Sequence, residues 1–517
     1  MSIHKSIAKS ASVIGFATLC SRILGLARDM VIAQLFGVYI YAQAFVIAFR
    51  IPNLFRDLVG EGASNAALVP VFSEYSARHS KEEFWELANV VLNLLLVILA
   101  GITIAGVILS PLLVRIFAPG FIADPEKLAI TVTLNRIIFP YILLISLAAY
   151  AMGILNSLKH FAVPAFAPCL LNISIIICAL IFGEGITGLA IGVLLGGILQ
   201  LAIQIPVLYK KGFHLKLFQR FKHPAAKTIG KLMVPRVISS GIYQLNNVVD
   251  SAFGSLAFIV GEGGVAALYF AYRLVQFPLG ILSNALAQAI LPAFSVQALE
   301  GERDNLKKTL SFGLRATFFV MIPASILLMS FARPVIKTIF AYGKFDAYAT
   351  DMTVNVLYFY SFGVVAYAVT KILQSCFFAV KDTVTPTKIA GLGLGLNIVL
   401  NAVLMFPLKI SGIALATSIS GIICSCTLFS ILKRKLAPFD DKDIRVAFFK
   451  IFSAGICMKL VCLYLRQNLT CGSGVLDKIL YLILLFTCGA AAYIIFCLIF
   501  RVREIHELRK CIFKKAL

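Results

Sequence analysis

The sequence predicts an all-α integral membrane protein in which two parallel six-helix repeats form N and C lobes around a central cavity, followed by two extra helices. Three observations predict this fold. The 517 residues are 60% hydrophobic and 14% charged, whereas soluble domains are about 45–50% apolar and about 25% charged. About fourteen apolar segments are long enough to cross a bilayer. Four short motifs also recur at a nearly constant offset.

The apolar segments were located with a window of about 19 residues. They are centred near residues 23, 57, 98, 145, 172, 196, 245, 278, 319, 364, 396, 421, 456 and 488. The first contains Arg22, Arg28 and Asp29 and has no small-residue cleavage site, so it is a span and not a signal peptide.

The second apolar segment, residues 44–75, is too long for a simple span. It contains Pro52, Gly60, Gly62 and Pro70. Interrupted helices are tolerated in membranes where they are buried or line a cavity. We therefore expect a broken helix that is the moving part of a transporter.

The internal repeat is visible in four motif pairs with offsets of 222 to 224 residues. The pairs are 48–51 with 271–274, 69–73 with 291–295, 111–120 with 334–343, and 186–190 with 410–414. The offset steps over six spans, an even number, so both copies cross the membrane in the same direction. The predicted domains are an N-terminal lobe (1–212), a basic cytoplasmic linker (213–226), a C-terminal lobe (227–437) and two further spans with a basic tail (438–517).

Lysine and arginine are distributed unequally between alternating loops. One side, which includes the N-terminus and the tail, holds 28 of the 47, and the other side holds nine. By the positive-inside rule, both termini are cytoplasmic. The basic loops also make anionic membrane lipids expected partners.

The remaining ten basic residues lie within predicted spans, where each costs about 2.5–3.5 kcal/mol at a helix centre. They are Arg22, Arg28, Arg50, Arg56, Arg236, Arg273, Arg315, Lys371, Lys450 and Lys459. Four of them are close enough to span ends to reach the interface, namely Arg236, Arg315, Lys450 and Lys459. The deeper Arg22, Arg28, Arg50, Arg56 and Arg273 should face a water-filled cavity between the lobes.

Acidic residues can neutralise only part of this charge. Asp29, Asp57, Glu61 and Asp250 are the available partners, so five arginines face four acids. A guanidinium group grips phosphate oxygens with two parallel hydrogen bonds. An anionic, phosphate-bearing substrate is therefore favoured over a purely structural ion-pair network.

Several common chemistries have no motif here. The sequence has no GxxxxGK[ST] loop, HExxH helix, paired-Asp metal motif or nucleophile elbow, which argues against an enzyme and against ATP hydrolysis through a P-loop. The stretch Gly391-Leu-Gly393-Leu-Gly395 lies within a span, and we expect Gly391 and Gly395 to allow close helix packing. We expect no cofactor and no nucleic-acid partner. An ion gradient, the membrane potential or consumption of the product would supply the energy.

The arginine motifs also carry a family resemblance. Residues 21–29, 44–56, 61–63 and 69–72 resemble the signature of the MurJ (MviN) lipid II flippases, within the superfamily of multidrug and polysaccharide exporters. The resemblance implies a bacterial inner-membrane protein of peptidoglycan synthesis and cell shape, working with cell-wall synthesis proteins. Its cargo would be lipid II, an undecaprenyl-pyrophosphate-linked muropeptide that crosses to the periplasmic leaflet by alternating access.

In that family, arginines matching Arg22, Arg28, Arg56 and Arg273 line the cavity and engage the pyrophosphate and sugar head. Arg50 would support them, Asp29 is the matching acidic partner, and the last two spans form a groove for the polyprenyl tail. Glu61, Asn53 and Asp57 are further gate or partner candidates.

Two positions depart from the family pattern. Gln43 and Tyr272 stand where many members carry Asp, so ion-coupling or salt-bridge roles do not transfer to them. Three alternatives stay open: a related exporter with a polysaccharide lipid or a drug as cargo, a membrane-embedded enzyme acting on polyprenyl phosphates, and a non-transporting scaffold.

Overall fold

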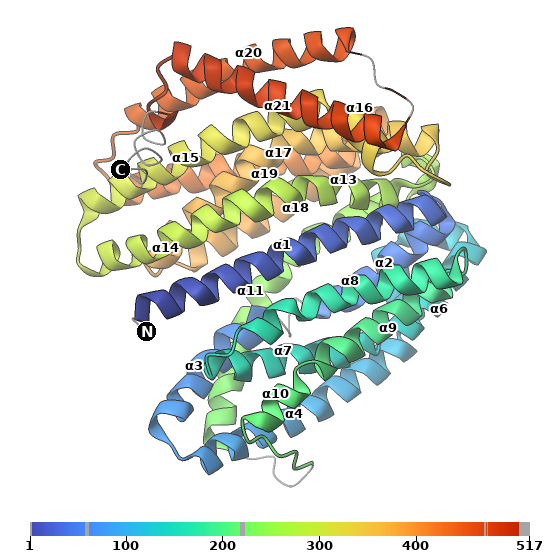
Figure 1. Ribbon diagram of the computed structural model, residues 1–517, viewed down its shortest axis with the longest axis vertical. Coiled ribbons are helices and arrows are strands. Elements are labelled where there is room, and N and C mark those ends of the chain that lie inside the picture. The colour runs from blue at the N-terminus through green and yellow to red at the C-terminus, as the bar shows by residue number, and fades with distance from the viewer. Residues whose placement is uncertain (1–2, 57–61, 218–222, 470–471, 473, 506–517) are drawn as a thin grey trace. The chain divides into compact units, whose positions relative to one another are not determined.

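The computed structural model describes residues 3–56, 62–217, 223–469, 472 and 474–505. These residues form helices joined by turns, with no β-strand among them. They make two compact units, Met1–Ala257 and Phe258–Leu517 (Figure 1). The predicted all-α fold is confirmed.

The first unit consists of eleven α-helices and a short 3₁₀ helix, η2, among its described residues. In chain order they are α1 (Ile3–Phe36), α2 (Ile40–Phe55), α3 (Gly62–Arg78), α4 (Lys81–Ile108), α5 (Ser110–Phe117), η2 (Pro119–Ala123), α6 (Pro125–Ile138), α7 (Tyr141–Ser157), α8 (Ala162–Phe182), α9 (Thr187–Ala202), α10 (Ile205–Lys210) and α11 (Pro224–Gly254).

The second unit is built from the remaining helices and one π-helical turn, η3. In chain order they are α12 (Ala257–Val260), α13 (Gly264–Pro278), η3 (Leu279–Ser283), α14 (Asn284–Leu299), α15 (Arg303–Ser330), α16 (Ala332–Ile339), α17 (Ala347–Ala379), α18 (Val384–Leu408), α19 (Ile410–Lys435), α20 (Lys442–Asn468) and α21 (Val475–Ile499).

The helix boundaries repeat along the chain as the motifs do. The 28-residue helices α4 and α15 begin 222 residues apart, and so do the eight-residue helices α5 and α16. The continuous helix α17 begins 222 residues after α6. Its counterpart in the first unit is the pair of consecutive helices α6 and α7. The internal duplication is therefore present in the structure as well as in the motifs.

The interrupted second span has a clear counterpart. In the first unit α2 ends at Phe55 and α3 begins at Gly62, and residues 57–61 between them lie outside the described chain. In the second unit α13 passes into α14 through the π-helical turn Leu279–Ser283. Such turns inside helices are uncommon and frequently lie at functional sites.

Eleven stretches of the described chain are long and apolar enough to cross a membrane. The predicted spans at α1, α2–α3 and α11 are not among them, and α2 is a shorter apolar helix. Charged residues such as Arg22, Arg28 and Asp250 interrupt these segments. The count of fourteen spans is not confirmed, and two of the three missing segments, α1 and α2–α3, carry residues of the predicted cationic site.

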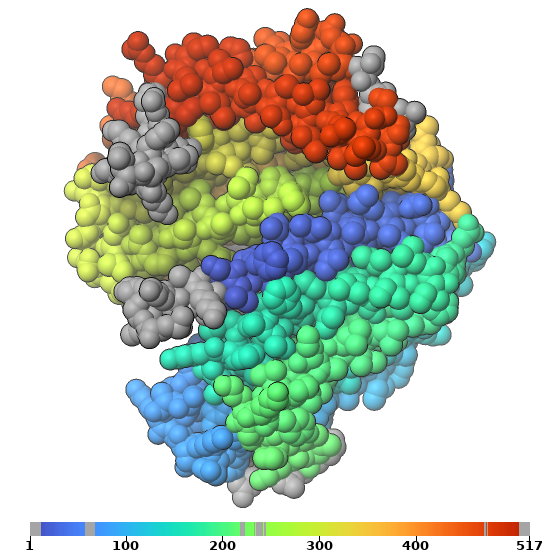
Figure 2. Space-filling view, in the orientation of Figure 1, coloured from blue at the N-terminus to red at the C-terminus, as the bar shows by residue number. Residues whose placement is uncertain are grey.

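The surface supports a membrane environment. Large apolar side chains are exposed along many helices of both units; on α20 and α21 these include Phe449, Leu460 and Ile483, at 65%, 62% and 57%. Figure 2 shows the space-filled surface of these two helices, coloured orange to red. In water, exposed apolar surface of this extent would be an aggregation liability. The chain is a multi-pass membrane protein.

The helix α11 belongs to the first compact unit, where it packs against α3, α4, α5 and η2. The predicted C-terminal lobe begins at residue 227, inside α11, whereas the compact units divide after Ala257. The division into lobes at 212 and 227 therefore stays a prediction based on the repeat.

Three helices end in the same unusual way. Lys159, Lys381 and Arg501 follow α7, α17 and α21 with φ of 58°, 59° and 51°, the left-handed region. In each turn the next residue donates its backbone N–H to a carbonyl five residues earlier, at 2.8–2.9 Å. This is the Schellman motif, in which the left-handed position is usually glycine. Here a basic residue occupies it.

Candidate functional site

The best-defined part of the predicted cationic site is a buried ion pair on α1. The Nη2 and Nε atoms of Arg28 lie 2.7 and 3.0 Å from Asp29 Oδ1. Arg28 is 4% exposed and Asp29 is fully buried. Two charges removed from water in this way depend on each other, because either one alone would be strongly unfavourable.

Two neighbouring helices fix the Arg28 guanidinium. Asn172 of α8 accepts a hydrogen bond from Arg28 Nη1 at 3.1 Å, and its Nδ2 donates to the Ser21 carbonyl at 3.1 Å. The ring of Phe49, from α2, lies 5.9 Å from the Arg28 Cζ atom. The guanidinium therefore donates to Asp29 and Asn172 and also faces an aromatic ring.

Sequence reasoning missed Asn172. Two signals could have found it: Asn172 is an amide within the apolar run 162–182, and its motif Leu-Asn-Ile recurs as 396–398 in the second repeat. Its counterpart Asn397 is also buried and donates to Thr417 Oγ1 at 3.2 Å. A polar side chain within a span usually has a hydrogen-bonding partner inside the protein.

Arg50 connects α2 to α11. Its Nη1 donates to the carbonyl of Asn247 at 3.2 Å and to the hydroxyl of Ser251. The neighbouring Asp250 is 7% exposed. Arg50 thus holds two helices of the first unit together.

The other predicted residues of the first unit are less well defined. Arg22, on α1, and Arg56, just after α2, are partly buried. Asn53 donates from Nδ2 to the Phe49 carbonyl one turn earlier, at 2.9 Å. Asp57 and Glu61 lie outside the described residues.

Arg273 lies on α13 of the second unit and is exposed. Its Nη2 is 3.1 Å from the hydroxyl of Tyr269, and its Cζ is 5.0 Å from the centre of the Tyr269 ring. The motif offset makes Arg273 the counterpart of Arg50. The two repeats therefore use one arginine position differently: Arg50 bridges helices, whereas Arg273 is held by its own helix and stays accessible.

Of the two positions that depart from the family pattern, one is buried and the other packs against an aromatic ring. Gln43 on α2 is 1% exposed. The ring of Tyr272 packs 5.6 Å from that of Tyr360 on α17. Burying a charge costs more than burying a neutral amide, which suits glutamine at position 43.

Arg315 on α15 has a partner that the sequence did not indicate. Its Nη1 forms an ion pair with Glu504 Oε1 at 2.9 Å, with side chains 13% and 7% exposed. The reason is the partly helical segment after α21, which brings an acid that hydropathy does not associate with α15. Lys450 contacts the Arg501 carbonyl at 3.4 Å, and the Arg236 side chain lies outside the described structure.

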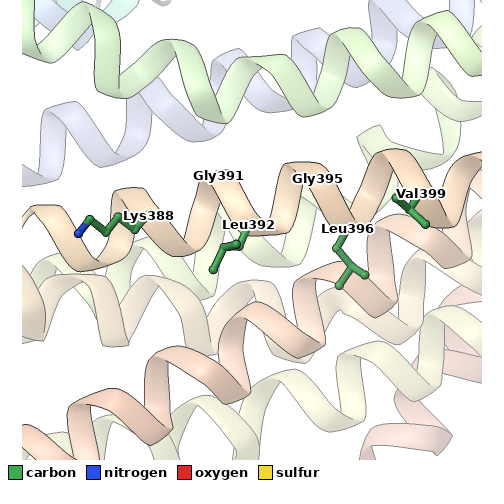
Figure 3. Close-up of a pocket in the computed structure, with 6 residues that line it drawn as sticks. All are labelled: Lys388, Gly391, Leu392, Gly395, Leu396 and Val399. Carbon is green, nitrogen blue, oxygen red and sulfur yellow. The ribbon is translucent and has the colours of Figure 1, made fainter.

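A groove of about 740 Å³ lies along α18 in the described part of the chain, and none of the predicted site residues lines it. Figure 3 shows its lining residues, from Lys388 to Val399. A Cβ atom added to Gly391 or Gly395 would meet nothing within 4 Å, so the prediction of close packing through these glycines is wrong. The close contact is at Gly393, where an added Cβ would lie 2.4 Å from Cys424 Sγ on α19.

Comparisons with known proteins agree with the geometry. Residues 32–484 match the model of the family described as lipid II flippase MurJ. A probable lipid II flippase MurJ of Buchnera aphidicola subsp. Acyrthosiphon pisum is 36% identical over 82% of both chains. The lipid II flippase MurJ of Burkholderia cenocepacia is 35% identical over 82% of this chain and 83% of its own.

Solved structures lead to the same group. A lipid II flippase MurJ in an inward closed conformation has a TM-score of 0.80 at 29% identity, over 94% of this chain and 98% of its own. An inward-facing multidrug resistance MATE family transporter of the MOP superfamily has a TM-score of 0.69 at 16% identity, over 82% and 96%. The second likeness concerns the fold alone.

Proposed function

The chain belongs to the lipid II flippase MurJ family, and on that premise we propose that it moves lipid II from the cytoplasmic to the periplasmic leaflet of a bacterial inner membrane, with both termini cytoplasmic. It does so as a transporter and not as an enzyme. An ion gradient or the membrane potential drives the cycle, and cell-wall synthesis proteins take up the product.

The observation that carries the proposal is the buried arginine of α1 and the accessible arginine of α13. Diphosphate oxygens can accept the same hydrogen bonds that Asp29 accepts from Arg28. In this structure the Arg28 donors are engaged by Asp29 and Asn172. Cargo binding at Arg28 therefore requires exchange of phosphate for carboxylate, and release of the cargo restores the ion pair.

Arg273 supplies the complementary part of the proposal. Arg273 is exposed and contacts Tyr269 on its own helix, so its guanidinium is accessible to an anion. Arg22 and Arg56 add positive charge in the first unit. Arg50 holds α2 against α11, and Asn53 lies near the end of α2. Asp57 and Glu61 remain gate or partner candidates from the sequence.

The test is transport by the full-length chain in proteoliposomes containing labelled lipid II, with and without an imposed membrane potential. We expect Arg28→Lys and Arg273→Gln each to slow transport by roughly 10–150-fold, as expected for loss of about 1.5–3 kcal/mol of charge-assisted hydrogen bonding. The matched control is Arg303→Gln, which removes an exposed arginine at the start of α15. Transport at the wild-type rate by both site variants would overturn the phosphate-exchange mechanism.

Cargo selection is tested in the same vesicles. Polyprenyl diphosphate carrying an unrelated oligosaccharide should cross much more slowly than lipid II. Equal rates would overturn the assignment of lipid II as the preferred cargo and favour a broader exporter.

A further inference from the structure

One face of α4 carries a regular polar stripe. Lys81, Trp85, Asn89 and Asn93 are spaced four residues apart, which places them on the same side of the helix. The stripe begins at the first residue of the helix and extends roughly 18 Å along it at 1.5 Å per residue. None of these residues is among the predicted cargo-binding or partner residues.

The stripe holds the chain segment that follows α10. Asn89 donates from Nδ2 to the His214 carbonyl at 3.0 Å and accepts from the Lys216 backbone N–H at 2.7 Å. Asn93 donates to the Lys216 carbonyl at 3.1 Å. Residues 212–217, which we call the strap, are thereby fixed along α4.

The strap has a buried side and an exposed side. Phe213 is 8% exposed, and its ring lies 5.6 Å from that of Trp85 in the core cluster of this end of the unit. Leu215 and Leu217 are each 47% exposed. Because α4 is a membrane-crossing helix, these two leucines are available to lipid.

Two hydrogen-bond donors converge where the strap begins. Gly212 has φ +99°, and a Cβ atom added to it would lie 3.0 Å from Lys81 Nζ and 3.4 Å from Trp85 Nε1. Trp85 is 9% exposed, and its Nε1 has no hydrogen-bond acceptor among the described residues. Ammonium and indole nitrogen atoms donate only, and a buried donor without an acceptor is costly.

Trp85 Nε1 is closed to solvent, and the exposed Lys81 side chain lies over Gly212, with its Cε also 3.0 Å from the added Cβ. An anionic oxygen would satisfy both donors once Lys81 swings away from Gly212. The exposed Glu82 and Glu83 on the first turn of α4 offset the diffuse positive charge of this surface. Recognition would therefore depend on the close donors Lys81 and Trp85 and on the absence of a side chain at Gly212. Lipid phosphate is the source favoured by the exposed leucines of the strap, since a soluble phosphate would gain nothing from them.

We propose that Lys81, Trp85 and Gly212 bind the phosphate of an anionic phospholipid whose acyl chains lie against Leu215 and Leu217. The distribution of lysine and arginine places this site in the cytoplasmic leaflet. The proposal rests on that orientation and is independent of the cargo.

Trp85 is the only tryptophan in the chain, so its fluorescence reports on the site directly. The full-length protein is placed in nanodiscs containing a fixed fraction of brominated lipid, which quenches tryptophan on contact. We expect brominated phosphatidylglycerol to quench Trp85 more strongly than brominated phosphatidylcholine. Lys81→Gln should weaken the apparent affinity for phosphatidylglycerol by about tenfold, the loss of one charge-assisted hydrogen bond, and Lys81→Arg should retain most of it.

The matched control is Lys308→Gln, which removes an exposed lysine near the start of α15, on the same predicted side of the membrane. It should leave the quenching unchanged. Equal quenching by the two lipids in the wild type, or an unchanged preference in Lys81→Gln, would overturn the proposal. If inorganic phosphate at constant ionic strength shifts Trp85 emission as much as phosphatidylglycerol does, the site binds free phosphate and the lipid assignment is wrong.

Discussion

Replacing Asn172 by alanine is the sharpest test of how the α1 ion pair is held. The change removes the acceptor for Arg28 Nη1 and the donor to the Ser21 carbonyl. A hydrogen bond to a charged group contributes about 1.5–3 kcal/mol and a neutral one about 0.5–1.5 kcal/mol. Hydrogen bonds between membrane helices measure lower, about 0.6 kcal/mol on average. We therefore expect the free energy of unfolding to fall by about 1–3 kcal/mol.

The assay combines unfolding with transport. Reversible denaturation in mixed micelles gives the stability, and labelled lipid II in proteoliposomes gives the rate. A double-mutant cycle with Arg28→Met isolates the pairwise term, which we expect to be about 1 kcal/mol or more because the two side chains are in contact. A role in positioning also predicts that Asn172→Ala slows transport after correction for the folded fraction.

The control for this prediction is Asn397→Ala in the second repeat. Asn397 is equally buried, but it donates to Thr417 and accepts from Asn401, so no arginine depends on it in those contacts. It should lower stability without slowing transport per folded molecule. A coupling energy near zero between Asn172 and Arg28, together with unchanged transport, would refute the reasoning.

Three further predictions concern other parts of the chain. Arg315→Met leaves Glu504 as a buried charge and should lower the free energy of unfolding by about 3 kcal/mol, while adding Glu504→Gln should recover most of it; urea titration of both variants decides this. Tyr269→Phe keeps the ring but removes the hydroxyl at Arg273, so the apparent affinity for lipid II should weaken by about 2–10-fold with an unchanged melting temperature, and an unchanged affinity would contradict a positioning role. Partial desolvation raises the pKa of Asp382, but hydrogen bonds from Lys435 and Thr385 and the Lys435 charge outweigh it and lower the pKa from 3.8 to about 2. Because this pKa is depressed, its contribution to stability is present above about pH 4 and is lost as pH falls towards 2, and melting curves of Asp382→Asn should lack that component.

The helices and the repeat could be predicted because their signal is local. Apolar windows found the segments that became α4, α8, α9 and α15, and motif offsets found a duplication that the helix boundaries reproduce. The windows also predicted spans at α1 and α11, which the structure does not confirm because charged residues lower the hydropathy of these helices.

The contacts of the site were harder to predict because they join distant parts of the chain. The sequence indicated Arg28 as an arginine deep in a span and Asp29 as one of four acidic partners, but nothing in it states that Asn172 lies beside them. The Arg315 ion pair was not predicted for the same reason, because its partner Glu504 is 189 residues away. Gly391 and Gly395 show the converse error: a spacing compatible with close packing does not determine which helix face meets a neighbour.

The basic residues in the left-handed turns destabilise the folded chain but contribute to the charge bias that orients it in the membrane. A side chain costs roughly 1–2 kcal/mol in the left-handed region, and a cation at a helix C-terminus regains about 0.3–1 kcal/mol of that. Replacing Lys159, Lys381 or Arg501 with glycine should relax the turn, yet each replacement removes a positive charge from the side that the charge distribution predicts to be cytoplasmic. A variant thermostabilised by placing glycine in these turns would therefore have a weaker charge bias to set its orientation in the membrane. The strained turns are the structural cost of that charge bias.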